Sequence, residues 1–434
     1  MMRQIHVKYG VGLLIACICL LTATTSSAVT YYWNPPSGGT GNWNTTDTLW
    51  GTVDTGSPTI VWSAGSTDTA VFDLYNGAGE TVAVDTGGIS AGALSFNVSG
   101  YTIAGPGILT LTTNSITVFG GKTATISANL AGSAGLQLTT TSGGSTVYNA
   151  GTLILSGDNS GLSGTIILTN SYLARTPTLV INSATALGTG SIQPATGASN
   201  TNSNGYSVID CTKPGGVTLT TANTVNMNGN LYFGGTQNLN FGAGSVLSLD
   251  STNEDTRVLG INGTANLQFG SLTNLRTNLR NLVLPGNGTG KLILGDVVIS
   301  PSSAYNETLA IIGTHNVDIT GTIMNSPSNG GGYGAFTWND SGTLTLSGSN
   351  NFQGTTTLQA GTVVLDYLAS DTNKITVGSG QYTPFAFSGS VNLQLKGGST
   401  TQSVYTNLNA GGSLELSRTA AGTSHLAITT FNAN

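Results

Sequence analysis

Charged side chains are scarce in this sequence. Only 7% of the 434 residues are Asp, Glu, Lys or Arg, against about 25% in ordinary soluble domains. Apolar residues still make up 38%, whereas disordered chains combine low hydrophobicity with high net charge. The chain is therefore expected to fold around an apolar core, with uncharged Thr, Ser and Asn covering its surface.

Basic residues are the rarer of the two charge signs, with 12 Lys and Arg against 18 Asp and Glu. Residues 1–28 contain two of the basic residues, Arg3 and Lys8. Nucleic acids and anionic membrane surfaces both attract basic patches. The acidic balance therefore predicts that neither is a partner.

The N-terminus reads as a secretory signal peptide over residues 1–28. Arg3 and Lys8 supply the positive region, and Val11–Leu21 is apolar but too short to span a bilayer. Ser26, Ser27 and Ala28 place small residues before a cleavage point after Ala28. No later stretch is apolar enough for a transmembrane helix, so no integral membrane span is expected.

Cysteine is nearly absent, with three residues in the chain. Cys17 and Cys19 lie in the signal region, and residues 14–17 also resemble a lipobox that would lipidate Cys17. Cys211 is then the only cysteine of the mature chain. An internal disulfide and a two-cysteine metal site are both excluded, and Cys211 is expected to be a small buried residue.

Short β-branched runs separated by Gly, Asn, Asp or Ser fill the chain after residue 31. Residues 108–112 (ILTLT), 165–168 (TIIL) and 344–346 (LTL) are examples in which apolar side chains alternate with Thr. This alternation is the pattern of half-buried strands. An antiparallel sandwich or barrel array and a parallel β-helix both fit such a sequence.

Three features favour the β-helix. Asn-Gly hairpins between matched strands are rare, Gly follows nearly every strand, and the pattern runs on without a change in composition, as in a solenoid. We predict an all-β, right-handed parallel β-helix, the hand following the general preference of parallel crossovers. Turns of ~20 residues would give about 20 of them. Residues 29–90 are expected to form a Trp-rich cap and 91–434 the β-helix.

One segment departs from the strand pattern. Leu272, Leu275, Leu279 and Leu282 are spaced three and four apart, which is typical of a helix face. Strands that place Arg276 and Arg280 on the outside are the alternative.

A clear internal repeat marks two parts of the chain. Residues 151–165 read GTLILSGDNSGLSGT and residues 342–356 read GTLTLSGSNNFQGTT, within repeat regions near 151–170 and 342–367. Each copy is interpreted as a strand with inward Leu, a Ser-Gly corner, an Asn-rich turn, an apolar plug (Leu162 or Phe352) and a second Gly corner.

This motif resembles the autotransporter-associated β-strand repeat. The usual continuation of that repeat is present at 360–365, and residues 33–62 are similar to the entry segment of such proteins. The resemblance covers about 95–192 and 340–400, and it implies an exported, surface-displayed β-helical passenger with a fibrous or adhesin-like role. The last residues, 428–434, show neither the alternating segments of a C-terminal membrane barrel nor a sorting tail. The chain is therefore expected to be released, held by a partner, or a truncated reading frame.

Groups that could carry catalysis are few. The densest ionisable cluster is Asp250, Glu254, Asp255 and Arg257, which reads as a solvated loop. Its carboxylates could otherwise serve a polysaccharide lyase or hydrolase. His315 and His425 lie far apart in sequence, and no metal-binding or phosphate-binding motif occurs. No catalytic residue, cofactor or metal is therefore expected.

Four of the five tryptophans, Trp33, Trp43, Trp50 and Trp62, fall in one N-terminal segment. They are expected to plug the open end of the solenoid, since uncovered strand edges pair with other chains. The alternative is a platform on which exposed rings contact extracellular glycans. The sequence as a whole predicts a secreted or cell-surface, adhesin-like scaffold without catalytic activity, with glycans or cell surfaces as possible partners and the oligomeric state left open. A carbohydrate-active or glycan-binding β-helix is the alternative.

Overall fold

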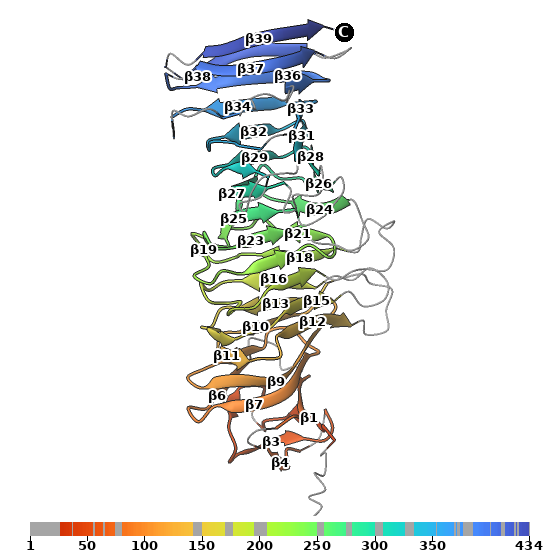
Figure 1. Ribbon diagram of the computed structural model, residues 1–434. Helices are drawn as coiled ribbons and strands as arrows, with labels where there is room; N and C mark the ends of the chain where they lie inside the picture. Colours follow the sequence, from red (N-terminus) through yellow and green to blue (C-terminus); the bar gives the residue numbers. More distant parts are fainter. Residues whose placement is uncertain are drawn as a thin grey trace, which may run out of the picture.

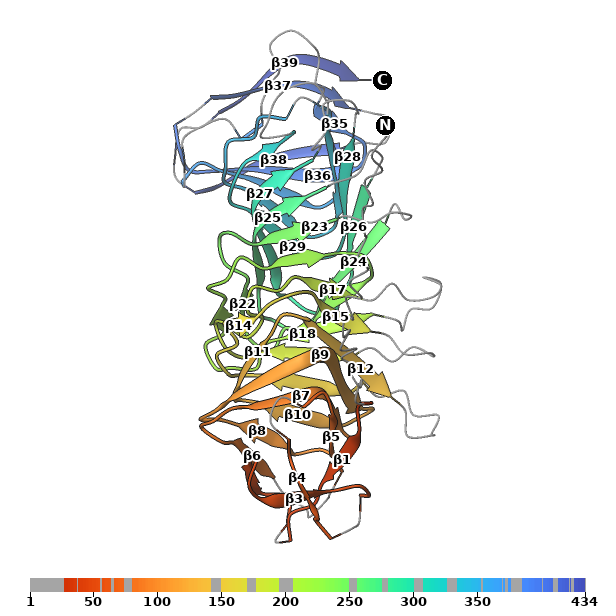
Figure 2. The same cartoon turned by 60° about the horizontal axis from the view of Figure 1, so that its bottom comes forward.

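The computed structural model shows a long rod of stacked strands (Figure 1). Strands follow one another along the rod axis in sequence order, from β1, β3 and β4 at one end to β39 at the other, and a second view shows the same two ends (Figure 2). The structure describes residues 27–433 except 37, 55–56, 64–65, 74–79, 142–149, 170–176, 195–205, 250–255, 275–279, 300–306, 326–333, 353, 369, 371–373, 376–384, 400, 409–412, 421 and 423–424. The predicted signal peptide therefore lies almost wholly outside the described residues.

The described strands form two sheets, of 16 and 23 strands. The smaller sheet contains β2 (Gly41–Trp43), β6 (Thr81–Val84), β8 (Thr102–Ala104), β10 (Thr123–Ile126), β13 (Thr152–Leu155), β16 (Thr178–Ile181), β18 (Ser207–Asp210), β21 (Leu231–Phe233), β24 (Thr256–Ile261), β26 (Arg280–Leu284), β28 (Thr308–Gly313), β31 (Ala335–Asp340), β33 (Thr356–Leu358), β35 (Phe385–Phe387), β37 (Thr401–Leu408) and β39 (His425–Ala433).

The larger sheet takes one long strand or two short ones from most turns. It contains β1 (Thr30–Trp33), β3 (Thr48–Gly51), β4 (Ile60–Val61), β5 (Thr69–Phe72), β7 (Ile89–Phe96), β9 (Ile108–Phe119), β11 (Asn129–Gly132), β12 (Leu136–Thr141), β14 (Gly161–Leu162), β15 (Ile166–Thr169), β17 (Ile192–Pro194), β19 (Val217–Thr218), β20 (Thr224–Asn226), β22 (Leu239–Asn240), β23 (Val246–Ser248), β25 (Leu267–Thr273), β27 (Lys291–Val298), β29 (Asn316–Ile319), β30 (Ile323–Met324), β32 (Thr343–Leu346), β34 (Thr362–Asp366), β36 (Ser390–Lys396) and β38 (Ser413–Ala420).

The core is a set of apolar columns that run along the rod. Leu153 of β13 pairs in register with Ala124 of β10 on one side and Leu179 of β16 on the other, and all three are fully buried. Because side chains alternate across a strand, the residues between them, such as Thr152 and Ile154, face outward. The prediction of an all-β parallel solenoid is confirmed, and the sandwich alternative is wrong.

Most turns are longer than the ~20 residues expected from the sequence. Thr123 pairs with Thr152, Thr152 with Thr178, and Thr178 with Val208, so these turns take 29, 26 and 30 residues. The rod therefore has fewer turns than the about 20 predicted. Strand periodicity sets the register within a strand, but it does not set the length of the connections.

A column of glycines allows the larger sheet to bend within each turn. Gly270, Gly295, Gly321 and Gly348 occupy equivalent positions on successive turns, and each lies against the backbone of the turn before it. A Cβ added to Gly295 would lie 2.0 Å from the carbonyl oxygen of Gly270, and one on Gly348 would lie 1.8 Å from that of Gly321. The predicted glycine corners are thus sites of close backbone approach.

The N-terminal end differs from the rest because its outermost strands are antiparallel. β3 pairs antiparallel with β1 and with β4, whereas β1 pairs parallel with β5 and so joins the first regular turn. Within the described residues the stack thus ends in a small antiparallel meander, and the role of this segment as a cap stays a prediction. The boundary of that segment at residue 90 stays a prediction.

The segment suspected of being helical contains strand at both ends. Leu272 belongs to β25 and Leu282 to β26, and both are buried, while Leu275, Arg276 and Leu279 lie outside the described residues. The expectation that Arg280 faces out is wrong, because its side chain is fully buried at the start of β26. The described part of the chain contains no helix, and so no helix that could cross a membrane.

Candidate functional site

The four N-terminal tryptophans form one aromatic cluster inside the solenoid. Their ring centroids are close, at 5.0 Å for Trp33–Trp50, 5.0 Å for Trp43–Trp62 and 4.6 Å for Trp50–Trp62, and Phe72 and Phe96 extend the cluster into the next turns. None of the four indoles is more than 1% exposed.

Stacking on a sugar requires an open ring face, and these four residues offer none. The glycan-contact interpretation of Trp33, Trp43, Trp50 and Trp62 is therefore not supported by the structure. Their burial instead agrees with a plug for the end of the rod. Two indoles are also tied to backbone, since Trp33 Nε1 donates to the Gly39 carbonyl (2.6 Å) and Trp62 Nε1 donates to the Ser90 carbonyl (2.9 Å).

The acidic cluster singled out in the sequence lies mostly outside the described residues, which exclude Asp250, Glu254 and Asp255. Arg257, its basic member, is 2% exposed and donates from Nε to the Met227 carbonyl at 2.6 Å. The arginine is therefore not on the open surface, where it would have to lie to meet an acidic polysaccharide.

The two histidines that follow residue 28 occupy different turns. His315 is buried at the corner between β28 and β29, and His425 begins β39, the last described strand. His315 Nδ1 lies 2.9 Å from the Leu284 carbonyl, which can only accept, so Nδ1 carries the proton. Its Nε2 has no hydrogen-bond partner in the described chain.

Asp340, at the end of β31, lies beside His315 in the same corner. Burial raises the pKa of this carboxyl, and hydrogen bonds from the backbone N–H groups of Gly342 and His315, with the charge of His315, oppose that rise. Asp340 Oδ2 has no partner in the described chain. Both side chains are enclosed by neighbouring turns, since Cβ atoms built on Gly286 and Gly313 would lie 3.0 Å from His315 Cε1 and from Asp340 Oδ2. The pair thus lies buried in the wall of the rod.

Cys211 is fully buried next to β18, as the sequence suggested. Burial raises the pKa of its thiol, so the reactive thiolate is disfavoured. Within the described residues, no group of three or more His, Cys, Asp or Glu side chains is placed to hold a metal ion.

The repeat contains a buried asparagine in the segment that the sequence predicted to be an Asn-rich turn. Asn159 is fully buried; its Oδ1 accepts from Leu130 N (2.9 Å) and its Nδ2 donates to the Ala186 carbonyl (2.8 Å). Asn350, at the equivalent position of the second copy, accepts from Ile323 N (2.7 Å) and donates to the Lys374 carbonyl. The repeat asparagine therefore connects the turn before it to the turn after it. The plug residues Leu162 and Phe352 are buried as expected.

An open groove of about 250 Å³ lies on the outer face of the larger sheet. It crosses four successive turns, from β19 through β22 and β25 to β27. We call it the amide groove. It is lined by Gly215, Gly216, Val217, Thr218, Asn238, Leu239, Asn240, Asn266, Gln268 and Ile293. None of these residues is charged.

Outward-facing side chains of consecutive strands give the groove its polar wall. Thr218, Asn240, Gln268 and Ile293 are in register on the four strands. Sequence reasoning missed this groove because these residues lie 22 to 28 positions apart along the chain. Only knowledge of each turn's length could have brought them together.

Residues 336–365 match the family model described as passenger-associated-transport-repeat. In the structure these residues run from β31 through β34 and include the second copy of the internal repeat, with Asn350. The chain is also 30% identical, over 362 residues, to the protein named adhesin BmaC autotransporter of Brucella suis biovar 1 (strain 1330). This chain is an autotransporter passenger-like repeat protein.

The likeness to the Brucella relative covers 75% of the passenger-like chain but 10% of the relative. The chain thus spans about a tenth of that protein's length. No solved structure matches the passenger-like chain. The residues that match the family model contain a strand, a glycine corner and the buried Asn350.

Proposed function

We propose that this chain is an exported, adhesin-like surface scaffold that carries no catalytic activity and makes contact through its outer polar face. The observation that carries the proposal is the division of roles across each strand. Inward positions form continuous apolar columns, and the outward column on the larger sheet is Thr218, Asn240, Gln268, Ile293, Asp318, Thr345, Val364, Gln394 and Ser417. The adhesin autotransporter named above supports a secreted or cell-surface location.

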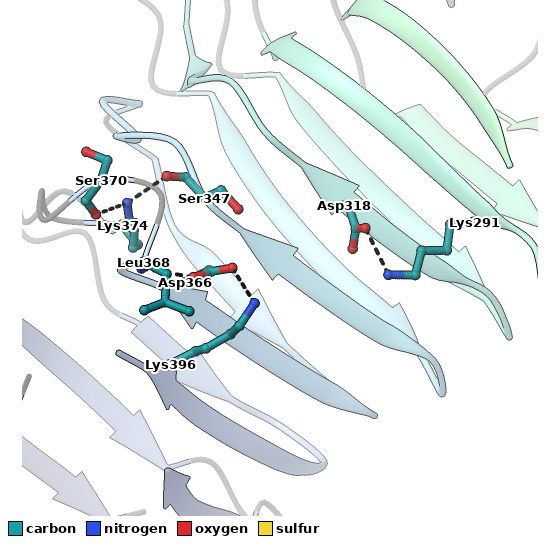
Figure 3. Close-up of polar contacts among 8 residues, drawn as sticks. All are labelled: Lys291, Asp318, Ser347, Asp366, Leu368, Ser370, Lys374 and Lys396. Atoms are coloured by element: carbon teal, nitrogen blue, oxygen red, sulfur yellow. Dashed lines mark hydrogen bonds and ion pairs between the residues drawn. The ribbon is translucent and has the colours of Figure 1, made fainter. Parts of the chain in front are cut away.

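The placement of charges supports a scaffold over an enzyme. A polysaccharide lyase or hydrolase on this fold would need acids and bases that converge at an open site. Two described cations, Lys291 and Lys396, are each paired with a carboxylate of a neighbouring strand (Figure 3), Lys291 with Asp318 at 3.0 Å and Lys396 with Asp366 at 2.8 Å. A third, Lys374, is buried and donates to the Ser347 and Ser370 carbonyls.

Display and adhesion test the proposal together. The chain would be expressed with its own N-terminus in a Gram-negative host, followed by surface proteolysis, analysis of the medium and N-terminal sequencing of the product. We expect the product at the surface or in the medium, beginning after Ala28. Beads coated with the product should adhere to host cells or extracellular matrix more than uncoated beads. Retention of the chain in the cytoplasm, or adhesion equal to that of uncoated beads, would contradict the proposal.

A second measurement addresses the absence of catalysis. The purified chain would be incubated with pectin, alginate and neutral polysaccharides, and reducing and unsaturated ends would be counted. We expect no increase over buffer. New reducing or unsaturated ends that form in proportion to the amount of protein would contradict the proposal and show that the chain is a carbohydrate-active enzyme.

A further inference from the structure

We infer that the amide groove binds an uncharged, hydroxyl-rich polysaccharide. This inference deepens the proposed function and rests on it, because it names the class of partner that an adhesive face would hold. The first support is that polar side chains recur at the same outward position on successive strands of the groove. Its strands are stacked ~4.8 Å apart, and each of the first three adds a polar side chain, Thr218, Asn240 and Gln268, at the same outward position. A polymer with regularly repeated polar groups matches such a wall.

The second support is the hydrogen-bonding capacity left on the wall. Asn238 Oδ1 accepts from Asn266 N (2.8 Å), Asn266 Oδ1 accepts from Lys291 N (3.0 Å), and Asn240 Oδ1 accepts from Gly242 N (2.8 Å). The oxygens therefore hold these side chains to the backbone. The Nδ2 groups of the same three residues make no hydrogen bond within the described chain, nor do the Gln268 amide and the Thr218 hydroxyl.

The wall thus offers amide donors fixed in place, together with an amide and a hydroxyl that can both donate and accept. A sugar hydroxyl has the same double character and can pair with every one of them. An anionic ligand would accept from the donors, but it would find no cation in the lining. Lys291, two residues before Ile293 on β27, is already paired with Asp318. The chemistry therefore favours an uncharged chain.

The direction of the groove argues against an extended peptide as its occupant. Peptides add to sheets along an unpaired strand edge, where backbone groups are open. The amide groove crosses four strands, of which β22, β25 and β27 are paired with strands on both sides and β19 is paired with β22. A peptide laid there could use only side-chain amides, and its own N–H groups would compete for few acceptors. Gly215 keeps one end open, since a Cβ there would meet nothing within 4 Å.

Binding by the purified full chain tests the inference. The uncharged probes are maltoheptaose, cellohexaose and galactomannan, the anionic probes are polygalacturonate and heparin, and a Gly-Ser peptide represents an extended polypeptide. Titration calorimetry or affinity electrophoresis gives the Kd. We expect an uncharged probe to bind with a Kd that changes little between low and high salt, because no ion pair is involved. Binding confined to the anionic probes or the peptide, or to none of the probes, overturns the inference.

Two variants locate the binding. Gln268→Ala and Thr218→Val remove groups that make no hydrogen bond within the described chain, so the fold should keep its melting temperature. Each is expected to weaken binding about 2- to 10-fold, the value of one hydrogen bond. Gln137→Ala is the matched control, since Gln137 faces outward between buried Leu136 and Leu138 as Gln268 does between Leu267 and Phe269, but off the groove.

An equal loss in Gln137→Ala, or no loss in Gln268→Ala, overturns the assignment to the amide groove. The bead assay separates this result from the proposed function. If the groove variants bind polysaccharide normally, the amide groove is not the binding site. If the coated beads still adhere to cells in that case, the proposed adhesin-like function stands without it.

Discussion

Asn159 reaches across the interior of the solenoid to Ala186, donating from Nδ2 to its carbonyl at 2.8 Å. The same amide accepts from Leu130 N on the opposite side. One side chain thus satisfies backbone groups from two different turns at a place that water does not reach.

We expect Asn159→Ala to lower the free energy of unfolding by about 2–4 kcal/mol, because a buried N–H and a buried carbonyl would both lose their partner. Urea unfolding followed by far-ultraviolet circular dichroism measures the change. Asn129→Ala is the control: Asn129 Oδ1 also accepts from a backbone N–H of the next turn, that of Asp158, but it is exposed and water can replace it. The control should cost under about 1 kcal/mol. Equal losses would show that burial is not the cause.

Gly157 is expected to tolerate no side chain. A Cβ there would lie 2.2 Å from the Ala128 carbonyl oxygen, so Gly157→Ala must push two turns apart, at a cost of about 1–3 kcal/mol. Gly87→Ala provides the contrast, since its Cβ would meet only Asp85 Oδ2, at 3.7 Å. That variant should change stability by less than about 0.5 kcal/mol. A stable Gly157→Ala chain would mean that the turns are not in close backbone contact.

The aromatic cluster allows a comparison of two indoles that differ in hydrogen bonding. Trp33 Nε1 donates to the Gly39 carbonyl, whereas Trp43 Nε1 is buried and has no partner in the described chain. Replacement by Phe leaves a similar cavity at both sites. We expect Trp33→Phe to be the more destabilising by about 1 kcal/mol, because only there is a hydrogen bond lost. Scanning calorimetry of the two variants measures the difference, and a larger loss in Trp43→Phe would contradict the geometry.

The two ion pairs on the larger sheet should differ in strength. The Asp366 side chain is 11% exposed and that of Asp318 is 22% exposed, while their lysine partners are more open to solvent. Lys396→Gln is therefore expected to lower the free energy of unfolding by about 1 kcal/mol, and Lys291→Gln by a few tenths of a kcal/mol. Both losses should be smaller at high salt. Unfolding in low and high salt checks this order. A reversed order, or no dependence on salt, would mean that charge attraction is not what the lysines contribute.

Asp340 should make stability fall as the pH rises through the acidic range. Burial raises the pKa of this carboxyl. Above its usual value of about 3.9, the unfolded chain loses the proton while the folded chain still holds it, so the free energy of unfolding decreases until the folded pKa is passed. Asp340→Asn keeps an acceptor for Gly342 N and removes the charge. We expect the free energy of unfolding of this variant to increase relative to that of the wild type as the pH rises.

The control for this pH dependence is Asp158. Hydrogen bonds, that with the Thr185 side chain first and then those with Ser160, lower the pKa of Asp158 at the surface. The sign is therefore opposite, and the contribution of Asp158 is lost as the pH falls through its lowered pKa. Above that pKa, the free energy of unfolding of Asp158→Asn should accordingly fall below that of the wild type. Parallel pH curves for the wild type and Asp340→Asn would show that the buried carboxyl does not control the effect.

Alternation within strands was enough to predict which residues face inward. Leu153 and Leu155 lie on one face of their strand and Ile154 on the other. The residues in register with both leucines on the neighbouring strands are also apolar. The role of Asn159 could not be predicted in this way, because Asn in a segment rich in Gly, Asp and Ser is typical of a turn. Its partners lie 29 residues before it and 27 after it in the sequence, and only the assembled stack brings them together.

The amide groove escaped prediction for a related reason. Thr218, Asn240 and Gln268 come together only because the turns between them take 22 and 28 residues, lengths that the connections decide. An outward Arg280 was one of two alternatives for its segment, and Arg is almost never fully buried unless it is paired. The structure buries it at the start of a strand, next to the columns that the apolar pattern did predict.

The crowding of four of the five tryptophans into one end of the rod gives the molecule a built-in reporter. Indole emission will come mostly from that end, whereas the far-ultraviolet dichroism averages over every strand. Solenoids hold together through contacts between adjacent turns, and long arrays can melt in sections. Comparing the two signals during a single titration would therefore show whether the rod frays from its tryptophan end or loses its other turns first.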